Sequence, residues 1–220
     1  MCYFLLLKKV IADNLLLLFD KEFFMTFVVY DTEYIADKGL KEEGFCGWQN
    51  REIIQIAAIK IDDNLNVLSK LNFYIKPKLH TGIPKYFVEL TGITDEVMES
   101  QGINFEDAYA KFKEFAGTDN CYSHSWDFEK ENDGDGEVVR EMLKIHNIKD
   151  ETQPNYKNIA FWFRDKYRQK NIDIKKQSSG EIAGLLGLSE NMKRIGLQPH
   201  NAFYDVYSIL EGLKYLGWNK

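Results

Sequence analysis

The stretch TFVVYDTEYI, residues 26–35, determines the fold class. Residues 27–30 are β-branched or aromatic, which favours a strand, and Asp31 and Glu33 follow two positions apart. Successive strand side chains point to opposite faces, so we expect both carboxylates on one face. Both faces of the preceding strand are apolar, which is typical of a central strand covered by helices. Two carboxylates near such a core repel each other unless a cation or proton intervenes; the alternative is that the strand ends and both acids are solvated.

The rest of the chain predicts a single layered α/β domain. Two further strands are expected at 51–62 and 70–77, with a polar hairpin turn at 62–66, and a fourth at 120–125. Strands followed by helices, with one strand inserted, predict a central mixed sheet of about five strands flanked by helices. The expected helices cover one or two short segments in 84–99, then 104–117, about 137–146, 158–170, 179–188 and 201–217.

Composition excludes some classes of protein. The 220 residues are 45% hydrophobic and 28% charged, with a net charge of −6, which is ordinary for one globular domain. This charge argues against a protein that coats DNA non-specifically, but not against an enzyme that acts on nucleic acid through bound metal. The three cysteines, Cys2, Cys46 and Cys121, form no C-x-x-C pair, and we interpret them as reduced thiols of a cytoplasmic protein.

Residues 1–24 precede the expected domain, which spans 25–220. They are rich in Leu and Phe, but Lys8, Lys9 and Asp13 interrupt them, so no uncharged stretch approaches the roughly 20 residues that cross a bilayer. They also lack the cleavage site of a signal peptide, and we expect no membrane association. One hypothesis is that translation begins at Met25, directly before the first strand; the other is a short amphipathic helix outside the domain.

Three more residues are candidates for a common site with Asp31 and Glu33. Asp127 follows the fourth expected strand, and His200 and Asp205 form H-x-x-x-x-D. Asn201 is a plausible helix cap, which leaves His200 in the preceding loop and Asp205 in the first turns of the last helix. Each alone is explained equally well as a solvated surface residue, whereas their joint order is far more specific.

That order, D-x-E, then D, then H-x-x-x-x-D, resembles the DnaQ-like (DEDDh) 3′→5′ exonucleases, which have an RNase H-like fold. The resemblance runs from about residue 26 to 217. The stretches REIIQIAAIKID, FYIKPKL, FVELTGIT and SSGEIAGLLGL are similar to the branch of KapD-like proteins and histone-mRNA 3′-end exonucleases. Two departures are Thr32, between the first two acids, and His124, where that branch has Gly.

The resemblance implies a site for two Mg²⁺ or Mn²⁺ ions, which suit carboxylate ligands and phosphodiester hydrolysis. Asp31 is expected to bridge the ions, with Glu33 and Asp205 completing the site of one of them and Asp127 assisting. His200 is expected to act as general base, since imidazole titrates near neutral pH.

Substrate contacts are predicted at three positions. Trp48 can stack on a base or simply pack, and Thr91, within LTGIT, lies beside the terminal nucleotide or in a plain turn. Trp126, directly before Asp127, is the third. The loop ENDGDG (131–136) is interpreted as solvated, because an EF-hand that starts at its first residue would need Glu at position 142, which is Met.

We therefore expect a metal-dependent 3′→5′ exonuclease that releases nucleoside 5′-monophosphates from single-stranded 3′ ends, with RNA preferred on branch resemblance alone. The alternatives are a DNA proofreading or repair exonuclease, and an inactive nucleic-acid-binding or protein-binding module on the same fold. The sequence does not indicate an oligomeric state.

Overall fold

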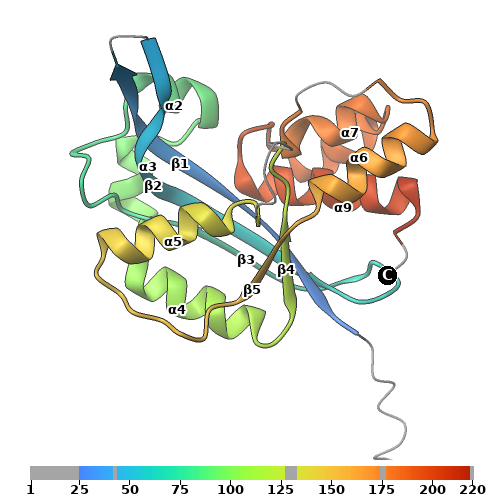
Figure 1. Cartoon of the computed structure of the whole chain (residues 1–220), viewed down its shortest axis with the longest axis horizontal. Helices are drawn as coiled ribbons and strands as arrows, with labels where there is room; N and C mark the ends of the chain where they lie inside the picture. The colour runs from blue at the N-terminus through green and yellow to red at the C-terminus, as the bar shows by residue number, and fades with distance from the viewer. Residues whose placement is uncertain (1–24, 42–43, 127–132, 174–176, 219–220) are drawn as a thin grey trace, which may run out of the picture.

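The computed structural model describes residues 25–41, 44–126, 133–173 and 177–218, with no side-chain description for residues 39–48 (Figure 1). Its five strands form one sheet in the order β3-β2-β1-β4-β5, in which β1 is antiparallel to β2 and parallel to β4. The predicted mixed sheet flanked by helices is therefore confirmed. The strands are β1 (Phe27–Lys41), β2 (Gly44–Ile61), β3 (Val67–Tyr74), β4 (Asn120–Ser123) and β5 (Asn155–Asn158).

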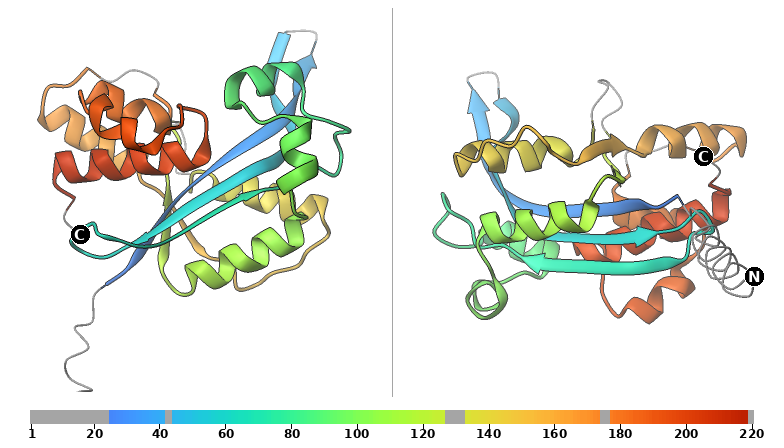
Figure 2. Two further views of the ribbon diagram at one scale, coloured as in Figure 1. Left: turned by 180° about the vertical axis from the view of Figure 1, so that it is seen from behind. Right: turned by 90° about the horizontal axis from the view of Figure 1, so that it is seen from below.

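The helices lie on both faces of this sheet (Figure 2). No helix within the described ranges is long and apolar enough to cross a membrane, and residues 1–24 lie outside those ranges. The α-helices are α2 (Lys85–Thr91), α3 (Asp95–Gln101), α4 (Phe105–Ala116), α5 (Gly136–Ile145), α6 (Ala160–Gln169), α7 (Ile182–Leu185), α8 (Ser189–Met192) and α9 (Ala202–Leu216), and the 3₁₀ turns are η1 (Ser179–Glu181) and η2 (Lys193–Ile195).

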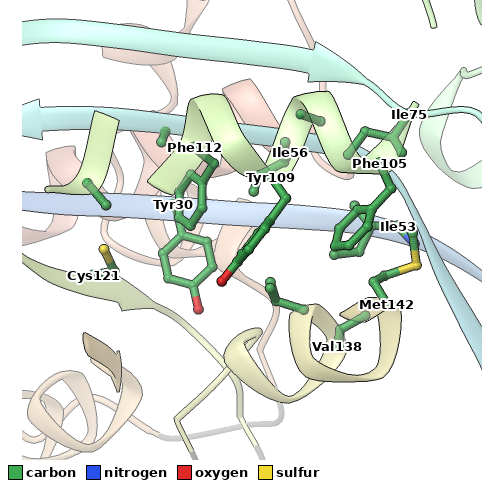
Figure 3. Close-up of a cluster of buried hydrophobic side chains, with 14 of the residues drawn as sticks. Tyr30, Ile53, Ile56, Ile75, Phe105, Tyr109, Phe112, Cys121, Val138 and Met142 are labelled. Atoms are coloured by element: carbon green, nitrogen blue, oxygen red, sulfur yellow. The ribbon is translucent and has the colours of Figure 1, made fainter. Parts of the chain in front are cut away.

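Strand β1 is central, as its two apolar faces predicted. Val28 and Tyr30 belong to a cluster with α4 and α5 on one face (Figure 3). Phe27 and Val29 belong to a cluster with α6, α7 and α9 on the other. Since both faces are covered by packed side chains, the end of β1 is held rigidly where its acidic residues follow.

Two features of the sheet depart from the sequence prediction. The edge strand β5 pairs in parallel with β4 but was not predicted, because NYKN carries no apolar alternation. In addition, β1 and β2 continue past their expected ends to residues 41 and 44, forming a hairpin arm beside α2 (Figure 1). A third apolar cluster, which includes Ile35, Ile54 and Phe87, joins the base of this arm to α2 and α3.

The last helix, α9, packs closely against α6 and α7. Asn201 caps it, as predicted, by accepting a hydrogen bond from the Phe203 N–H, and Gly212 faces its neighbours. A Cβ at Gly212 would lie 2.6 Å from Ile182 Cγ2 and 2.7 Å from Phe163 Cε1. The absence of a side chain at this position therefore sets how near α9 comes to α6 and α7.

We expect Gly212→Ala to lower the free energy of unfolding by about 1–3 kcal/mol, because the methyl group overpacks a buried contact. The matched control is Gly184→Ala in α7, where an added Cβ meets no atom within 4 Å. That variant should be neutral or more stable by up to about 1 kcal/mol, since Ala favours helix over Gly. Chemical denaturation of both variants measures the difference, and equal stability would contradict this account of the packing.

Candidate functional site

Three segments distant in sequence bring four carboxylates to one pocket of about 410 Å³. Asp31 and Glu33 extend from β1, opposite Ala57 and Gln55 of β2, on the face that α9 covers. Asp205 lies in the first turn of α9, and Asp135 directly precedes α5. The side chains of β1 and α9 are buried here, with exposed fractions of 4% for Asp31, 8% for Glu33 and 2% for Asp205.

His200 completes this group at the start of α9. It adopts a left-handed backbone conformation, with φ of 65°, in the turn before the Asn201 cap. Its backbone N–H donates to Asp205 Oδ1 at 3.2 Å. Ligand atoms of Glu33, His200 and Asp205 all lie within 4.8 Å of one another. The structure thus brings together four of the five predicted acid and histidine residues.

The fifth, Asp127, lies outside the described residues, and a different acid occupies the pocket beside the other three. Thr32 donates to Asp135 Oδ2 twice, from its backbone N–H at 2.8 Å and from Oγ1 at 3.0 Å. The Asp135 N–H in turn donates to Ser123 Oγ at 2.9 Å. The interpretation of ENDGDG as a wholly solvated loop is therefore wrong at Asp135, because Thr32 and Ser123 hold this residue in the pocket.

The sequence did contain a signal for Asp135. It follows Gly134, which has φ of 66°, and immediately precedes the apolar pattern of α5, so it stands where helix-capping acids are common. Gly134 also packs so tightly on the Ser123 hydroxyl that an added Cβ would clash with it. Thr32, noted only as a departure, is the residue that fixes this acid.

Burial and mutual repulsion dominate the electrostatics of the pocket. Burial, followed by the charges of Asp205 and Asp135, raises the pKa of Asp31 and that of Glu33 well above the usual values. Burial raises the pKa of Asp205 to about 7, although hydrogen bonds from Ser179 and from the His200 backbone oppose the shift. Burial likewise raises the pKa of Asp135 to about 6, against the hydrogen bonds from Thr32.

This donor set fits hard divalent cations. Carboxylate oxygens are the ligands that Mg²⁺ and Mn²⁺ prefer, and a cation between them relieves the repulsion that raises their pKa values. Arg51 lowers the pKa of Asp135 through its charge, but its guanidinium is hydrogen-bonded to Glu141, with Nε 2.8 Å from Oε2. A second histidine, His124, lines the pocket, but burial lowers its pKa to about 4, so it adds no positive charge at neutral pH.

The predicted substrate contacts lie in three different settings. Trp126 lines the pocket and is 42% exposed. Thr91 is buried at the end of α2, where its hydroxyl donates to the Phe87 carbonyl at 2.8 Å and accepts from the Ile93 N–H at 3.1 Å. Trp48 belongs to the hairpin arm, where its backbone pairs with Lys38, and its side chain is not described.

Sequence reasoning missed Tyr86, in the wall that α2 contributes to the pocket, but placed LTGIT (90–94), which begins with Leu90, beside the terminal nucleotide. Tyr86 and Leu90 line the pocket, and Tyr86 is 56% exposed. The sequence predicted one or two short helices within 84–99 but singled out no aromatic residue on them. The pocket therefore has aromatic side chains on α2 and after β4, with the carboxylates between these segments and α9.

Removal of divalent cations should make stability depend on pH. The pKa values of the buried carboxylates are higher in the folded than in the unfolded chain, so the folded state binds more protons. In chelator, the free energy of unfolding should therefore decrease as the pH rises from about 5 to about 8, by on the order of 1 kcal/mol or more. Glu33→Gln should flatten this slope, whereas Glu99→Gln, an exposed control on α3, should not. A slope that is the same in all three proteins would contradict the raised pKa values.

Comparison with known proteins identifies the fold. The nuclease domain of 3′hExo, a DEDDh family member bound to rAMP, has a TM-score of 0.59 and 16% identity, over 89% of this chain and 94% of that one. A 3′-exonuclease that recognises the histone mRNA stem-loop has a TM-score of 0.58 and 16% identity, over 90% and 84%. E. coli ExoI in complex with ssDNA has a TM-score of 0.63 and 20% identity, over 86% of this chain but 40% of its own. At these identities the likeness establishes the RNase H-like fold alone.

Sequence comparison gives the family. No curated protein sequence matches the chain. The family described as RNase_T, Exonuclease, matches residues 28–212, a range that contains every residue of the pocket. Because this match spans most of the 220 residues, the protein belongs to the RNase_T exonuclease family.

Proposed function

We propose that this nuclease is a 3′→5′ exonuclease that releases nucleoside 5′-monophosphates from single-stranded nucleic acid, with RNA preferred over DNA. One observation carries the proposal: Asp31, Glu33, Asp205 and His200 converge in a single pocket although they lie far apart in the sequence. Family membership supports phosphodiester hydrolysis, and the preference for RNA rests on resemblance to the histone-mRNA branch.

The carboxylates of Asp31, Glu33, Asp205 and Asp135 would hold two divalent cations, Mg²⁺ or Mn²⁺. When bound, such cations neutralise charge at phosphorus, lower the pKa of water and stabilise the leaving oxygen. In this proposal Asp135 supplies the fourth carboxylate, since Thr32 holds it beside the other three. The assignment of Asp127 to that role stays a prediction from the sequence.

His200 is the group best suited to accept the proton of the attacking water. Its imidazole lies on the pocket, within 4.8 Å of carboxylate oxygens of Glu33 and Asp205, and it is half-buried rather than enclosed. The turn before α9 holds its backbone in place through the bond to Asp205, while the ring keeps access to the pocket. General-base help of this kind contributes about 10²–10⁴-fold to the rate.

The aromatic walls suit an unpaired strand end. Tyr86 and Trp126 present exposed rings on the pocket, and stacking on an aromatic ring contributes about 1–3 kcal/mol per base without regard to sequence. Two structural relatives bind rAMP and ssDNA, respectively, which supports a single-stranded substrate here. A paired end would need unstacking before a base could reach these rings.

The direct test uses 5′-labelled RNA and DNA oligomers with Mg²⁺, Mn²⁺ or chelator. We expect a ladder of shortened products on RNA, weaker on DNA, that disappears in chelator and in Asp31→Ala. Blocking the 3′ end should protect the oligomer, whereas blocking the 5′ end should not. Equal or faster cleavage of DNA would favour a proofreading or repair enzyme, and no cleavage under any condition would favour an inactive binding module.

A second prediction distinguishes the two candidates for the fourth carboxylate. Asp135→Asn keeps the shape of the side chain but removes its charge, so kcat should fall by about 10²-fold or more, as expected when a metal-holding charge worth several kcal/mol is lost. Asp127→Asn should retain most activity. The reverse pattern would restore the assignment made from the sequence, and circular dichroism of both variants checks that the fold is intact.

A further inference from the structure

The hydroxyl of Ser179 joins two of the pocket carboxylates. Its Oγ lies 2.8 Å from Asp31 Oδ1 and 3.0 Å from Asp205 Oδ2. Ser179 is buried, with 7% of its surface exposed, and it comes from η1, a segment separated from β1 by most of the chain. It was not among the site residues predicted from the sequence.

The residues that follow this hydroxyl also contact α9. Ser208, on α9, donates from Oγ to the Gly180 carbonyl at 3.2 Å and accepts from the Ala183 N–H at 3.0 Å. Gly180 packs so closely on Asp205 that an added Cβ would clash with its carboxylate. Gly180, directly after Ser179, thus packs on the Asp205 carboxylate itself, and the hydroxyl of Ser179 lies between β1 and α9.

We propose that Ser179 is a positioning residue that sets the separation and orientation of Asp31 and Asp205 for divalent cations. This inference rests on the proposed function. A hydroxyl carries one proton and two lone pairs, so it donates to one carboxylate at a time and can alternate between the two. Asp31 thereby keeps its other oxygen available for a cation, whereas the other oxygen of Asp205, Oδ1, also accepts the His200 N–H and has only its remaining lone pair for a cation.

Without this hydroxyl, two buried like charges lose the donor that they share. Repulsion then favours side-chain orientations that separate Asp31 from Asp205, and a cation must reverse this change when it binds. Residues that orient metal ligands in this way typically contribute 10–100-fold to metal affinity or activity. We therefore expect Ser179→Ala to weaken cation binding by roughly 10–100-fold.

The test is a titration of the full chain with Mn²⁺, without substrate, in which the electron paramagnetic resonance signal of free Mn²⁺ reports binding. Wild type, Ser179→Ala, Ser208→Ala and Asp31→Ala are compared, and thermal unfolding in chelator is measured for each. Ser208→Ala is the matched control, because it removes a buried hydroxyl from the same region that bonds η1 but neither carboxylate. It should lower the melting temperature while changing the Mn²⁺ affinity by less than about threefold, since the ligands keep their own partners.

The outcomes separate the two proposals. Weaker Mn²⁺ binding in Ser179→Ala than in Ser208→Ala, at equal or higher thermal stability, supports the positioning role. Wild-type affinity in Ser179→Ala, or an equal loss in both serine variants, overturns that role and leaves the proposed function intact. Failure of the wild-type protein itself to bind Mn²⁺ more tightly than Asp31→Ala overturns both.

Discussion

The repulsion among four carboxylates in one pocket is the interaction on which the rest of this structure depends. In water such groups would move apart, and near an apolar core their repulsion is stronger. The chain prevents separation by placing them on its most rigid elements. Asp31 and Glu33 continue the central strand, whose preceding residues are buried on both faces, and Asp205 lies on a helix whose other face packs into the core. The free energy gained by burying apolar side chains thus offsets the repulsion among the carboxylates when no cation is bound.

Hydrogen bonds then fix the acids individually, and each donor comes from a different part of the chain. Thr32 holds Asp135 from the strand side, Ser179 spans Asp31 and Asp205, and the His200 backbone holds the second oxygen of Asp205. These donors are neutral, so they orient the carboxylates and lower their pKa values only in part. The remaining negative charge of the carboxylates would favour cations over anions in this pocket. The protein as a whole has a net charge of −6.

Patterns of apolar residues predicted most of the fold, because strands 27–35 and 51–62 and helices 104–117 and 201–217 each bury a regular face. Strand β5 was not predictable, since the NYKN sequence lacks a strand pattern and these residues join the sheet by pairing with the edge of β4. The same distinction applies to the site. Asp31, Glu33, His200 and Asp205 were predicted because their joint order along the chain resembles that of a known family. Asp135 and Ser179 were missed because the contacts that place them in the pocket are with residues more than a hundred positions away, Thr32 for the first and Asp31 for the second.

The two sides of the pocket are built by different means, and this has a consequence for how it works. The side formed by α9 is secured by a large apolar cluster and by the buried Ser208 bonds. The side formed by α2 rests on a smaller cluster and on the fully buried carboxylate of Glu52, which accepts the backbone N–H groups of residues 78–80 in the loop before α2. Under the proposed function, the groups that would hold cations to within fractions of an ångström lie on β1 and α9, where displacement would disrupt the main core. The exposed ring of Tyr86, which would meet bases of any sequence, lies on the short helix, where small adjustments disturb few contacts. Rigidity is therefore concentrated where the chemistry needs fixed geometry, and the side that would receive varied nucleotides is the one least constrained by packing.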